Sequence, residues 1–365
     1  MKCLAAVAHK VKEPFSLETI ELPEPGADEV LVKIAGVGLC HTDLSSKDGL
    51  IPSPYPVVFG HEGSGVVERV GSQVRKVAPG DHVVLSFASC GLCEHCLTGE
   101  PAYCDVWLPA NVCMLPNCTR GQLGDGSPVF LKYFGQSSFG EYALATERNV
   151  VKVRKDVPIE LLGPMGCGIQ TGAGTVLNGL RPAAGSSLAV LGSGSVGLAA
   201  ILGALVCGCT TVIAIDVMES RLEMARSLGA THTINGKGID VAEALRRIVP
   251  RGVDCMVDTT ALPELVQSAS AALAIRGKLG LVGVPHPTAE LKLAFIQILT
   301  SGITVQGFGE GHCVPDSFIP RLIDLYAQGR FPFDKMVTFY PFRDINRAVE
   351  DQKAGKVVKV ILRHE

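Results

Sequence analysis

Aromatic residues and long uncharged runs are both scarce in this sequence. Only 5% of the 365 residues are aromatic, with a single tryptophan. The longest nearly uncharged apolar stretch, residues 196–209, contains glycines and is shorter than the roughly 20 residues that a membrane-spanning helix needs. The apolar run 3–8 near the start is likewise too short for the core of a signal peptide. We therefore expect no membrane association and predict a soluble, cytoplasmic protein.

The sequence also has little excess of either charge. It contains 33 Lys and Arg residues against 36 Asp and Glu residues, for a net charge of -3. No cluster of basic residues runs along the chain, and such a cluster is the usual footprint of a nucleic-acid or anionic-membrane surface. Neither is expected as a partner.

Glycine, by contrast, is abundant, and the composition indicates a packed chain with many tight turns. There are 41 glycines, and 47% of the residues are apolar. This balance is typical of Val-, Ala- and Leu-rich strands and not of disorder. A chain of this length is long for one hydrophobic core, so we expect two domains. The first 150 residues read as all-β, with short strands at 31–34, 64–70 and 81–85.

From about residue 186 the pattern changes to strands that alternate with helices. We expect strands at 187–191, 211–215, 231–234, 253–258, 278–284 and 303–307. We expect helices at 195–206, 219–228, 241–248 and 264–273. This alternation predicts a doubly wound parallel sheet. The tail adds a helix at 317–328 and a strand at 357–362, which we expect to return to the first domain because six strands already complete such a sheet.

A glycine-rich turn in the second region predicts a dinucleotide site. Gly192, Gly194 and Gly197 follow an apolar strand and open a helix, and Asp216 ends the next strand. These glycines permit a tight turn, close approach of the pyrophosphate and close helix packing. The Asp216 carboxylate would bind the adenosine ribose and repel a 2′-phosphate, which favours NAD over NADP. Arg221 could reach the same ribose or face solvent.

Thirteen cysteines are many for a chain without a secretory signal, where metal ligation is favoured over disulfides. Four of them lie on one short loop: Cys90, Cys93, Cys96 and Cys104. Their spacing fits a closed Cys₄ zinc site with a structural role. An iron–sulfur cluster uses similar spacings, but nothing else in the chain indicates electron transfer.

A second set of potential ligands is dispersed, and spacing alone does not connect its members. The segments are Cys40-His41-Thr42-Asp43, Gly60-His61-Glu62-Gly63 and Pro164-Met165-Gly166-Cys167-Gly168. Together with the cysteine loop and the glycine turn, in this order, they resemble the zinc-containing medium-chain alcohol dehydrogenases over essentially the whole chain. The stretches 38–44, 134–139, 162–174 and 329–335 resemble the benzyl (aryl) alcohol dehydrogenase branch in particular.

The resemblance assigns roles around a catalytic zinc. It implies that Cys40, His61 and Cys167 are the ligands, with Glu62 close behind the metal. Asp43 is similar to the carboxylate that orients the ligand histidine. Thr42 is similar to the family's hydroxyl residue that takes the proton from the alcohol.

The resemblance also assigns cofactor and substrate contacts. His41 is similar to a residue that contacts the cofactor pyrophosphate, although it could be an exposed loop histidine. Lys359 lies where relatives place an arginine for the same phosphates. Thr171 and Val196 would border the nicotinamide. The candidates for an apolar substrate wall are Phe87 and Trp107, although residues of this kind are more often plain core.

One residue departs from the family pattern. Many members end the proton relay in a histidine three residues after the position of Thr42, where this chain has Ser45. Serine cannot act as a base near neutral pH, so the relay must end in water or another group. Seven cysteines have no assigned partner: Cys3, Cys113, Cys118, Cys207, Cys209, Cys255 and Cys313.

The expected protein is therefore a two-zinc, NAD-linked dehydrogenase. The resemblance implies an α/β chain: a GroES-like β-rich catalytic domain at 1–168 and 309–365 holds both zinc sites, and a Rossmann coenzyme domain spans 169–308. The expected reaction is reversible oxidation of a primary aromatic or allylic alcohol to the aldehyde. The alternatives are a geraniol- or perillyl-type or general primary alcohol dehydrogenase, a glutathione-dependent formaldehyde dehydrogenase, or a binding protein that kept only the fold. A homodimer or homotetramer is expected.

Overall fold

The computed structural model describes residues 1–116 and 118–364, which divide into two compact units. The first unit contains Met1–Cys167, Val314–Asp324 and the stretch from Val337 onward. The second contains Gly168–Cys313 and Leu325–Met336.

The first unit is built on two β-structures. A closed barrel contains β1 (Lys2–Ala8), β2 (Ser16–Glu21), β7 (Arg120–Gln122), β8 (Pro128–Phe130) and β4 (Val57–Val58). A mixed sheet runs in the order β10 (Val150–Lys152), β6 (His82–Leu85), β5 (Gly63–Val70), β3 (Glu29–Gly38), β18 (Lys359–Arg363) and β17 (Val337–Pro341), with β9 (Tyr142–Thr146) also paired to β3. The central strand β3 is rich in Val, Leu and Ile, which favour a pleated, buried surface. The strands predicted at 31–34, 64–70 and 81–85 are confirmed as parts of β3, β5 and β6.

Short helices interrupt the strands in the region that the sequence predicts as all-β. They are α1 (His41–Lys47), α2 (Glu94–Leu97) and α3 (Trp107–Asn111). In α1 the carboxylate of Asp43 accepts the backbone N–H of Cys40 at 3.0 Å, which satisfies a free donor at the helix start. The helix has no apolar periodicity beyond Leu44, so pattern alone does not reveal it.

The second unit is a parallel sheet in the doubly wound order. The strands run β13 (His232–Asn235), β12 (Thr211–Asp216), β11 (Ser187–Leu191), β14 (Val253–Asp258), β15 (Leu273–Leu281) and β16 (Thr304–Gly307). Its helices include α4 (Gly168–Gly174), α5 (Ser195–Val206), α6 (Glu219–Ser227), α7 (Val241–Ile248), α8 (Pro263–Ser270) and α9 (Phe295–Ser301). The predicted α/β fold is confirmed. Strand β15 begins earlier than predicted because α8 ends at Ser270 and the strand is already paired at Leu273, ahead of an irregularity that includes Arg276 with a φ of 65°.

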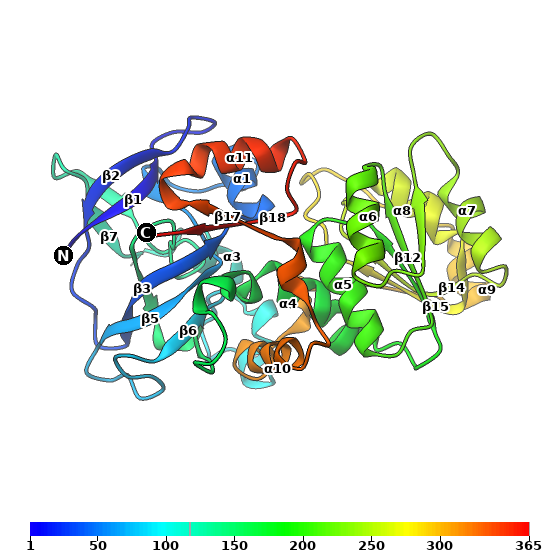
Figure 1. Cartoon of the computed structure of the whole chain (residues 1–365), viewed down its shortest axis with the longest axis horizontal. Helices are drawn as coiled ribbons and strands as arrows, with labels where there is room; N and C mark the ends of the chain where they lie inside the picture. Colours follow the sequence, from blue (N-terminus) through cyan, green and yellow to red (C-terminus); the bar gives the residue numbers. More distant parts are fainter. Residues whose placement is uncertain (117, 365) are drawn as a thin grey trace. The chain divides into compact units, whose positions relative to one another are not determined.

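The C-terminal tail adds more structure than the sequence analysis predicts. Helix α10 (Pro315–Ala327) is close to its predicted position, whereas β17 and α11 (Ile345–Lys353) were not anticipated. Strand β18 pairs antiparallel with β3, Ile361 opposite Gly38, which confirms its return to the first unit. Figure 1 shows β18 beside β3, with α11 against β17 and β18. Among the described residues, none of the helices has the length and apolar character required to span a membrane.

Candidate active site

The dispersed potential ligands converge within the first unit. Cys40 precedes α1, His61 and Glu62 precede β5, and Cys167 is the last residue of the unit's first segment. One potential ligand atom from each of these four residues lies within 4.8 Å of those of the others. Three elements far apart in sequence therefore present two sulfurs, an imidazole and a carboxylate to one point.

Asp43 connects the two ligand segments. One carboxylate oxygen accepts the Nδ1–H of His61 at 2.8 Å and the backbone N–H of Gly60 at 3.1 Å, and the other accepts the backbone N–H of Cys40. Asp43 and His61 are almost completely buried. The hydrogen bond to Nδ1 fixes the ring so that Nε2 faces the cluster, as a carboxylate does for a metal-bound histidine.

The atoms of the cluster fit a metal ion. The Nε2 of His61 is buried and has no hydrogen-bond partner among the described residues, which is costly unless a ligand occupies it. The pKa of Cys40 is held well below the usual thiol value, first by a hydrogen bond from Cys167 and then by His61, against the opposing effect of burial. Burial disfavours a charged His61, but Asp43 and Cys40 raise its pKa well above the usual value. Thiolate and imidazole are the donors that zinc prefers.

Glu62 and Lys359 form a fully buried ion pair beside the cluster. The ammonium of Lys359 contacts the Glu62 carboxylate and donates to the backbone carbonyl of Leu39 at 3.2 Å. Lys359 is only 1% exposed. Burial opposes its charge, but Glu62 and Cys40 hold the pKa of Lys359 above its usual value. The resemblance predicts a contact of Lys359 with the cofactor phosphates, and in the structure its ammonium has these other partners.

The proposed proton-relay residues lie on α1. The Oγ1 of Thr42 is 3.7 Å from the Sγ of Cys40, so its hydroxyl borders the cluster. His41 is exposed at the first position of the helix. Ser45 is buried, with 8% of its surface exposed. Because this position is a serine, the relay has no histidine here.

Aromatic rings cover one side of His61, and sequence reasoning found only part of this set. The ring of Phe134 lies 4.4 Å from that of His61 in a tilted arrangement, and Trp107 meets Phe134 edge-on at 5.7 Å. The second predicted wall residue, Phe87, is buried in the same apolar core as Phe134. Phe134 was visible to sequence reasoning only inside a stretch of family likeness, with no signal of its own.

Gln136, in the same stretch, supports the ligand strand. Its side-chain amide donates to the carbonyls of His61 at 2.9 Å and Ser86 at 3.1 Å, and its oxygen accepts the N–H of Gly63 at 3.0 Å. Gln136 is fully buried, and these bonds hold the backbone from His61 to Gly63 against the segment at Ser86.

The four loop cysteines form a second cluster, with their sulfurs within 4.8 Å of one another. The Sγ atoms of Cys90 and Cys96 are 4.0 Å apart, and tetrahedral zinc with Zn–S bonds of about 2.3 Å separates sulfurs by about 3.8 Å. Backbone N–H groups of Leu92 and Cys93 donate to the Cys90 sulfur at 3.4 Å and lower its pKa to about 6. This donor set fits a closed zinc site.

The glycine turn of the second unit fits a pyrophosphate. A Cβ on Gly197 would lie 1.9 Å from the carbonyl oxygen of Gly192, so the helix approaches the turn as closely as glycine permits. A Cβ on Gly194 would meet nothing within 4 Å, which leaves space at the start of α5. The buried hydroxyl of Ser193 has no hydrogen-bond partner among the described residues. Free N–H groups at a helix start bind anions, and the orphaned hydroxyl adds a donor that the sequence analysis missed.

Asp216 closes the turn from the neighbouring strand. Its carboxylate accepts the backbone N–H of Ser193 at 2.7 Å and those of Val217 and Met218 at 2.8 and 3.0 Å. Arg221, nearby on α6, is buried, and its burial lowers its pKa while Asp216 opposes the shift. The carboxylate is thus fixed at the carboxyl end of β12, where a doubly wound sheet binds the adenosine ribose.

The two predicted nicotinamide neighbours, Thr171 and Val196, lie on α4 and α5, and both are half-buried. The hydroxyl of Thr171 donates to the carboxylate of Glu310 at 3.4 Å.

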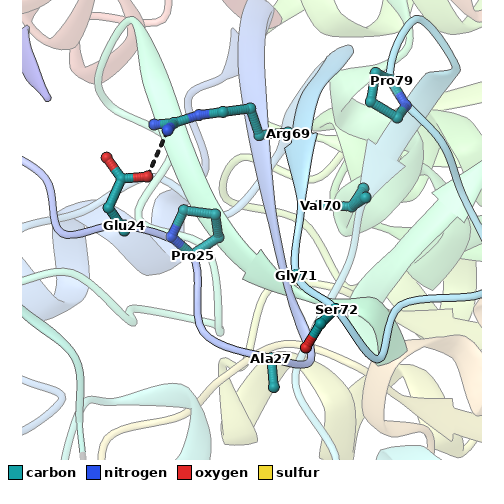
Figure 2. A pocket seen from close by; sticks show the side chains of 8 residues that line it. All are labelled: Glu24, Pro25, Ala27, Arg69, Val70, Gly71, Ser72 and Pro79. Carbon is teal, nitrogen blue, oxygen red and sulfur yellow. Dashed lines mark hydrogen bonds and ion pairs between the residues drawn. The ribbon is translucent and has the colours of Figure 1, made fainter.

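A hollow of about 580 Å³ lies elsewhere on the first unit (Figure 2). Its lining residues are Glu24, Pro25, Ala27, Arg69, Val70, Gly71, Ser72 and Pro79. The exposed ion pair between Glu24 and Arg69 borders it, and no predicted site residue lines it. Binding sites for small molecules are usually lined by apolar and aromatic side chains, so the metal cluster is the better candidate site.

Comparisons with known proteins agree with this geometry. The family described as zinc-binding dehydrogenase matches residues 195–328, and the alcohol dehydrogenase GroES-like domain matches residues 26–155. The chain is 45% identical over 362 residues to the geraniol dehydrogenase of Castellaniella defragrans, covering 98% of this chain and 96% of the relative.

Solved structures match over the whole chain. The benzyl alcohol dehydrogenase of Acinetobacter calcoaceticus is 44% identical with a TM-score of 0.95, covering 100% of both chains. An alcohol dehydrogenase zinc-binding domain protein from Burkholderia ambifaria is 46% identical with a TM-score of 0.98, covering 100% of this chain and 99% of the other.

Proposed function

The chain belongs to the zinc-binding alcohol dehydrogenase family, and we propose that it oxidises a primary allylic or aromatic alcohol to the aldehyde with NAD as hydride acceptor. The observation that carries the proposal is the unpartnered Nε2 of His61, held by Asp43 beside the sulfurs of Cys40 and Cys167. In this proposal the first unit is the catalytic domain and the second unit binds the coenzyme.

Zinc at this cluster would supply a Lewis acid that lowers the pKa of a bound hydroxyl group. Cys40, His61 and Cys167 would hold it, and two thiolates with a neutral imidazole would leave the centre formally neutral. The buried pair of Glu62 and Lys359 adds no net charge to this balance. The chain's own residues would therefore keep the site near neutrality, so that it would not over-stabilise negative charge on the substrate.

Thr42 is the proposed entrance to the proton path. Its hydroxyl borders Cys40 and can accept a hydrogen bond from the alcohol and donate another onward. Ser45 offers no titrating group for the next step. We therefore expect the proton to leave through water, and the rate of oxidation to rise with pH without a histidine inflection from this position.

The preference for NAD rests on Asp216. A carboxylate at the end of β12 can accept hydrogen bonds from a ribose hydroxyl, and its charge opposes a 2′-phosphate. Ser193, Gly194 and the start of α5 would receive the pyrophosphate.

The substrate class rests on the aromatic side of the cluster and on the named relatives. Phe134 lies next to the His61 ring and Trp107 meets Phe134 edge-on, so aromatic side chains gather near the cluster and favour a substrate whose alcohol carbon is attached to a flat ring or double bond. The relatives include a geraniol dehydrogenase and a benzyl alcohol dehydrogenase, and both names describe alcohols next to a double bond or ring. A glutathione-dependent formaldehyde dehydrogenase is the second candidate, but the segment 105–130 offers only Arg120 as a partner for the tripeptide's carboxylates.

The test is a panel of alcohols assayed with NAD and ranked by kcat/KM. The panel contains benzyl alcohol, geraniol, their saturated counterparts cyclohexylmethanol and tetrahydrogeraniol, ethanol, and S-hydroxymethylglutathione. The proposal expects the unsaturated alcohols to exceed their saturated counterparts by about tenfold or more, roughly 1.4 kcal/mol in transition-state binding. Equal values within each pair, or a preference for the glutathione adduct, would overturn the substrate assignment.

We also propose that the protein assembles as a homodimer or homotetramer through the second unit. Strand β16 ends the sheet. Nearby α9 exposes Phe295 by 78%, Ile296 by 64% and Leu299 by 67%. An open strand edge beside exposed apolar side chains is typical of an interface that continues a sheet in a second copy.

A further inference from the structure

Cys113 and Cys118 are two of the cysteines without an assigned role, and neither belongs to the two metal clusters described above. Both lie in the segment after α3, five positions apart in the sequence. Cys113 is only 4% exposed, whereas Cys118 is half-buried. One of the two thiols is therefore accessible to small solutes and the other is enclosed.

Strand pairing places Cys113 beside Lys132. The preceding residue, Val112, pairs antiparallel with Tyr133. In antiparallel pairing the next residue of one segment lies opposite the previous residue of the other, so Cys113 comes opposite Lys132. The backbone of Cys113 has a φ of 58°, in the left-handed region that side chains disfavour, so its surroundings must fix this position.

Cys118 reaches the same lysine from the other direction. The backbone N–H of Leu131 donates to the carbonyl of Thr119 at 3.1 Å, which continues the antiparallel pairing of β7 with β8. The residue before Thr119 therefore also comes opposite Lys132. The two thiols meet there, and that of Cys113 donates a hydrogen bond to the sulfur of Cys118.

The surroundings of the pair favour a thiolate at Cys118. The hydrogen bond from Cys113 lowers the pKa of Cys118, and the positive charge of Lys132 lowers it further, against the opposing effect of burial. The same hydrogen bond, together with burial, raises the pKa of Cys113. The ammonium of Lys132 is held in place by Glu29 at 2.8 Å and by the carbonyl of Leu144 at 3.0 Å. An accessible thiolate beside an enclosed thiol is the arrangement of a redox-sensing cysteine pair.

We propose that Cys113 and Cys118 are a modification site that forms a reversible disulfide with a peroxide as oxidant. The thiolate of Cys118 attacks one oxygen of hydrogen peroxide, the O–O bond breaks, and hydroxide leaves a sulfenic acid on Cys118. The sulfur of Cys113 then attacks the Cys118 sulfur, the S–O bond breaks, and the departing hydroxide takes the Cys113 proton. The proton first lost by Cys118 neutralises the first hydroxide. The two thiols lose two electrons in total, and the peroxide is reduced to two molecules of water.

A dithiol reductant reverses the modification by thiol–disulfide exchange and is itself oxidised to a disulfide. The site is separate from the proposed alcohol oxidation and does not depend on which alcohol the protein uses. It lies in the segment after α3, the helix that carries Trp107. Because Trp107 is the only tryptophan of the chain, its fluorescence reports on this part of the molecule.

The test treats the zinc-loaded protein with hydrogen peroxide, blocks the remaining thiols with iodoacetamide and cleaves the chain before aspartate. The resulting peptide 105–124 contains Cys113, Cys118 and no other cysteine. After oxidation it should carry no alkyl group and be two hydrogens lighter than the reduced peptide. Dithiothreitol should restore two alkylatable thiols, and both zinc ions should stay bound throughout. The fluorescence of Trp107 should change on oxidation and recover on reduction.

Two single variants separate the roles of the two thiols. In Cys113→Ser, oxidation of Cys118 should stop at the sulfenic acid, which dimedone traps. In Cys118→Ser, the thiol of Cys113 should be lost at least about tenfold more slowly than in the wild type, because a buried thiol is a poor nucleophile. Cys207→Ser is the matched control, since Cys207 is a half-buried cysteine of the second unit, and it should form the disulfide as the wild type does.

Three results would overturn the inference. They are two alkylated cysteines in the peptide after peroxide treatment, oxidation of Cys118 beyond the sulfenic acid in the wild type, and release of zinc before the peptide changes. Because the peptide mapping uses the wild-type chain, its result does not depend on whether the variants fold.

Discussion

The hydrogen bonds of Asp43 predict how much zinc affinity the proposed catalytic site loses when this residue is replaced. In Asp43→Asn the side chain keeps its shape, but one of its two oxygens becomes an NH₂ group. If the remaining oxygen stays on the His61 Nδ1 and the Gly60 N–H, the NH₂ faces the backbone N–H of Cys40, which is now 3.0 Å from a carboxylate oxygen. In the variant, the new NH₂ group and the backbone N–H of the ligand residue Cys40 are therefore two donors that face each other without an acceptor.

The magnitude follows from that lost acceptor. A buried donor left unsatisfied costs about 1–3 kcal/mol. Loss of a partner behind a metal ligand typically weakens metal binding by about 10–100-fold. We expect Asp43→Asn to weaken zinc binding at the Cys40, His61 and Cys167 site by that factor. Zinc binding at the Cys90–Cys104 loop should be unchanged.

The assay is competition with a chromophoric zinc chelator, followed by metal analysis of the recovered protein. Asp48→Asn is the matched control, because Asp48 caps the same helix α1 from a partly exposed position. The variant should release one zinc at lower chelator concentration and retain the other. Release of both zincs together, or of neither more readily than in the wild type, would refute the role assigned to Asp43.

Four further predictions concern other parts of the molecule. Asp216→Asn removes the charge that opposes a 2′-phosphate, so the ratio of kcat/KM for NAD over NADP should fall by about tenfold or more, roughly 1.4 kcal/mol; an unchanged ratio would count against the ribose assignment. Ser45→His supplies a base with an ordinary pKa of about 6.5, so an inflection near that pH should enter the pH–rate profile, and an identical profile would contradict the relay. Cys104→Ser should lose one zinc while the other stays bound, and should lower the free energy of unfolding by about 2–5 kcal/mol if the zinc site stabilises the loop as much as a native disulfide would; retention of both zincs would argue against a Cys₄ site. Ile296→Asp should shift the assembly toward the monomer in analytical ultracentrifugation, and a distribution identical to that of the wild type would exclude α9 from the interface.

The strands and four of the helices of the second unit could be predicted from sequence because their signals are local, whereas α4 and α9 were not predicted. Helix α7 begins where predicted, after Asp240, whose carboxylate accepts the N–H groups of Ala242 and Glu243 at 2.9 and 3.2 Å. An apolar strand, a turn and a periodic helix each leave a mark in a short window of sequence. Helix α11 of the first unit was not predicted, although its sequence carries the same kind of local signal. Its buried residues Ile345, Ala348 and Val349 follow the helical spacing.

The two metal clusters differ in how far sequence alone could reach. Cys90, Cys93, Cys96 and Cys104 lie on one loop, so their spacing already limits the distances between their sulfurs. Cys40, His61 and Cys167 come from three separate elements, and only the pairing of strands brings those elements together. Spacing carries no information about such pairing, and family likeness had to supply it.

Lys359 shows the same limit at the level of one side chain. It is 320 residues from Leu39, whose carbonyl it contacts, and only the register of β18 on β3 brings the two together. From sequence the lysine reads as a free cation, suited to a phosphate. In the structure it is enclosed with Glu62, and a buried carboxylate without its partner would be strongly destabilising. The positive charge of Lys359 therefore balances the buried carboxylate of Glu62 beside the metal cluster. A contact with the cofactor is not needed to explain it.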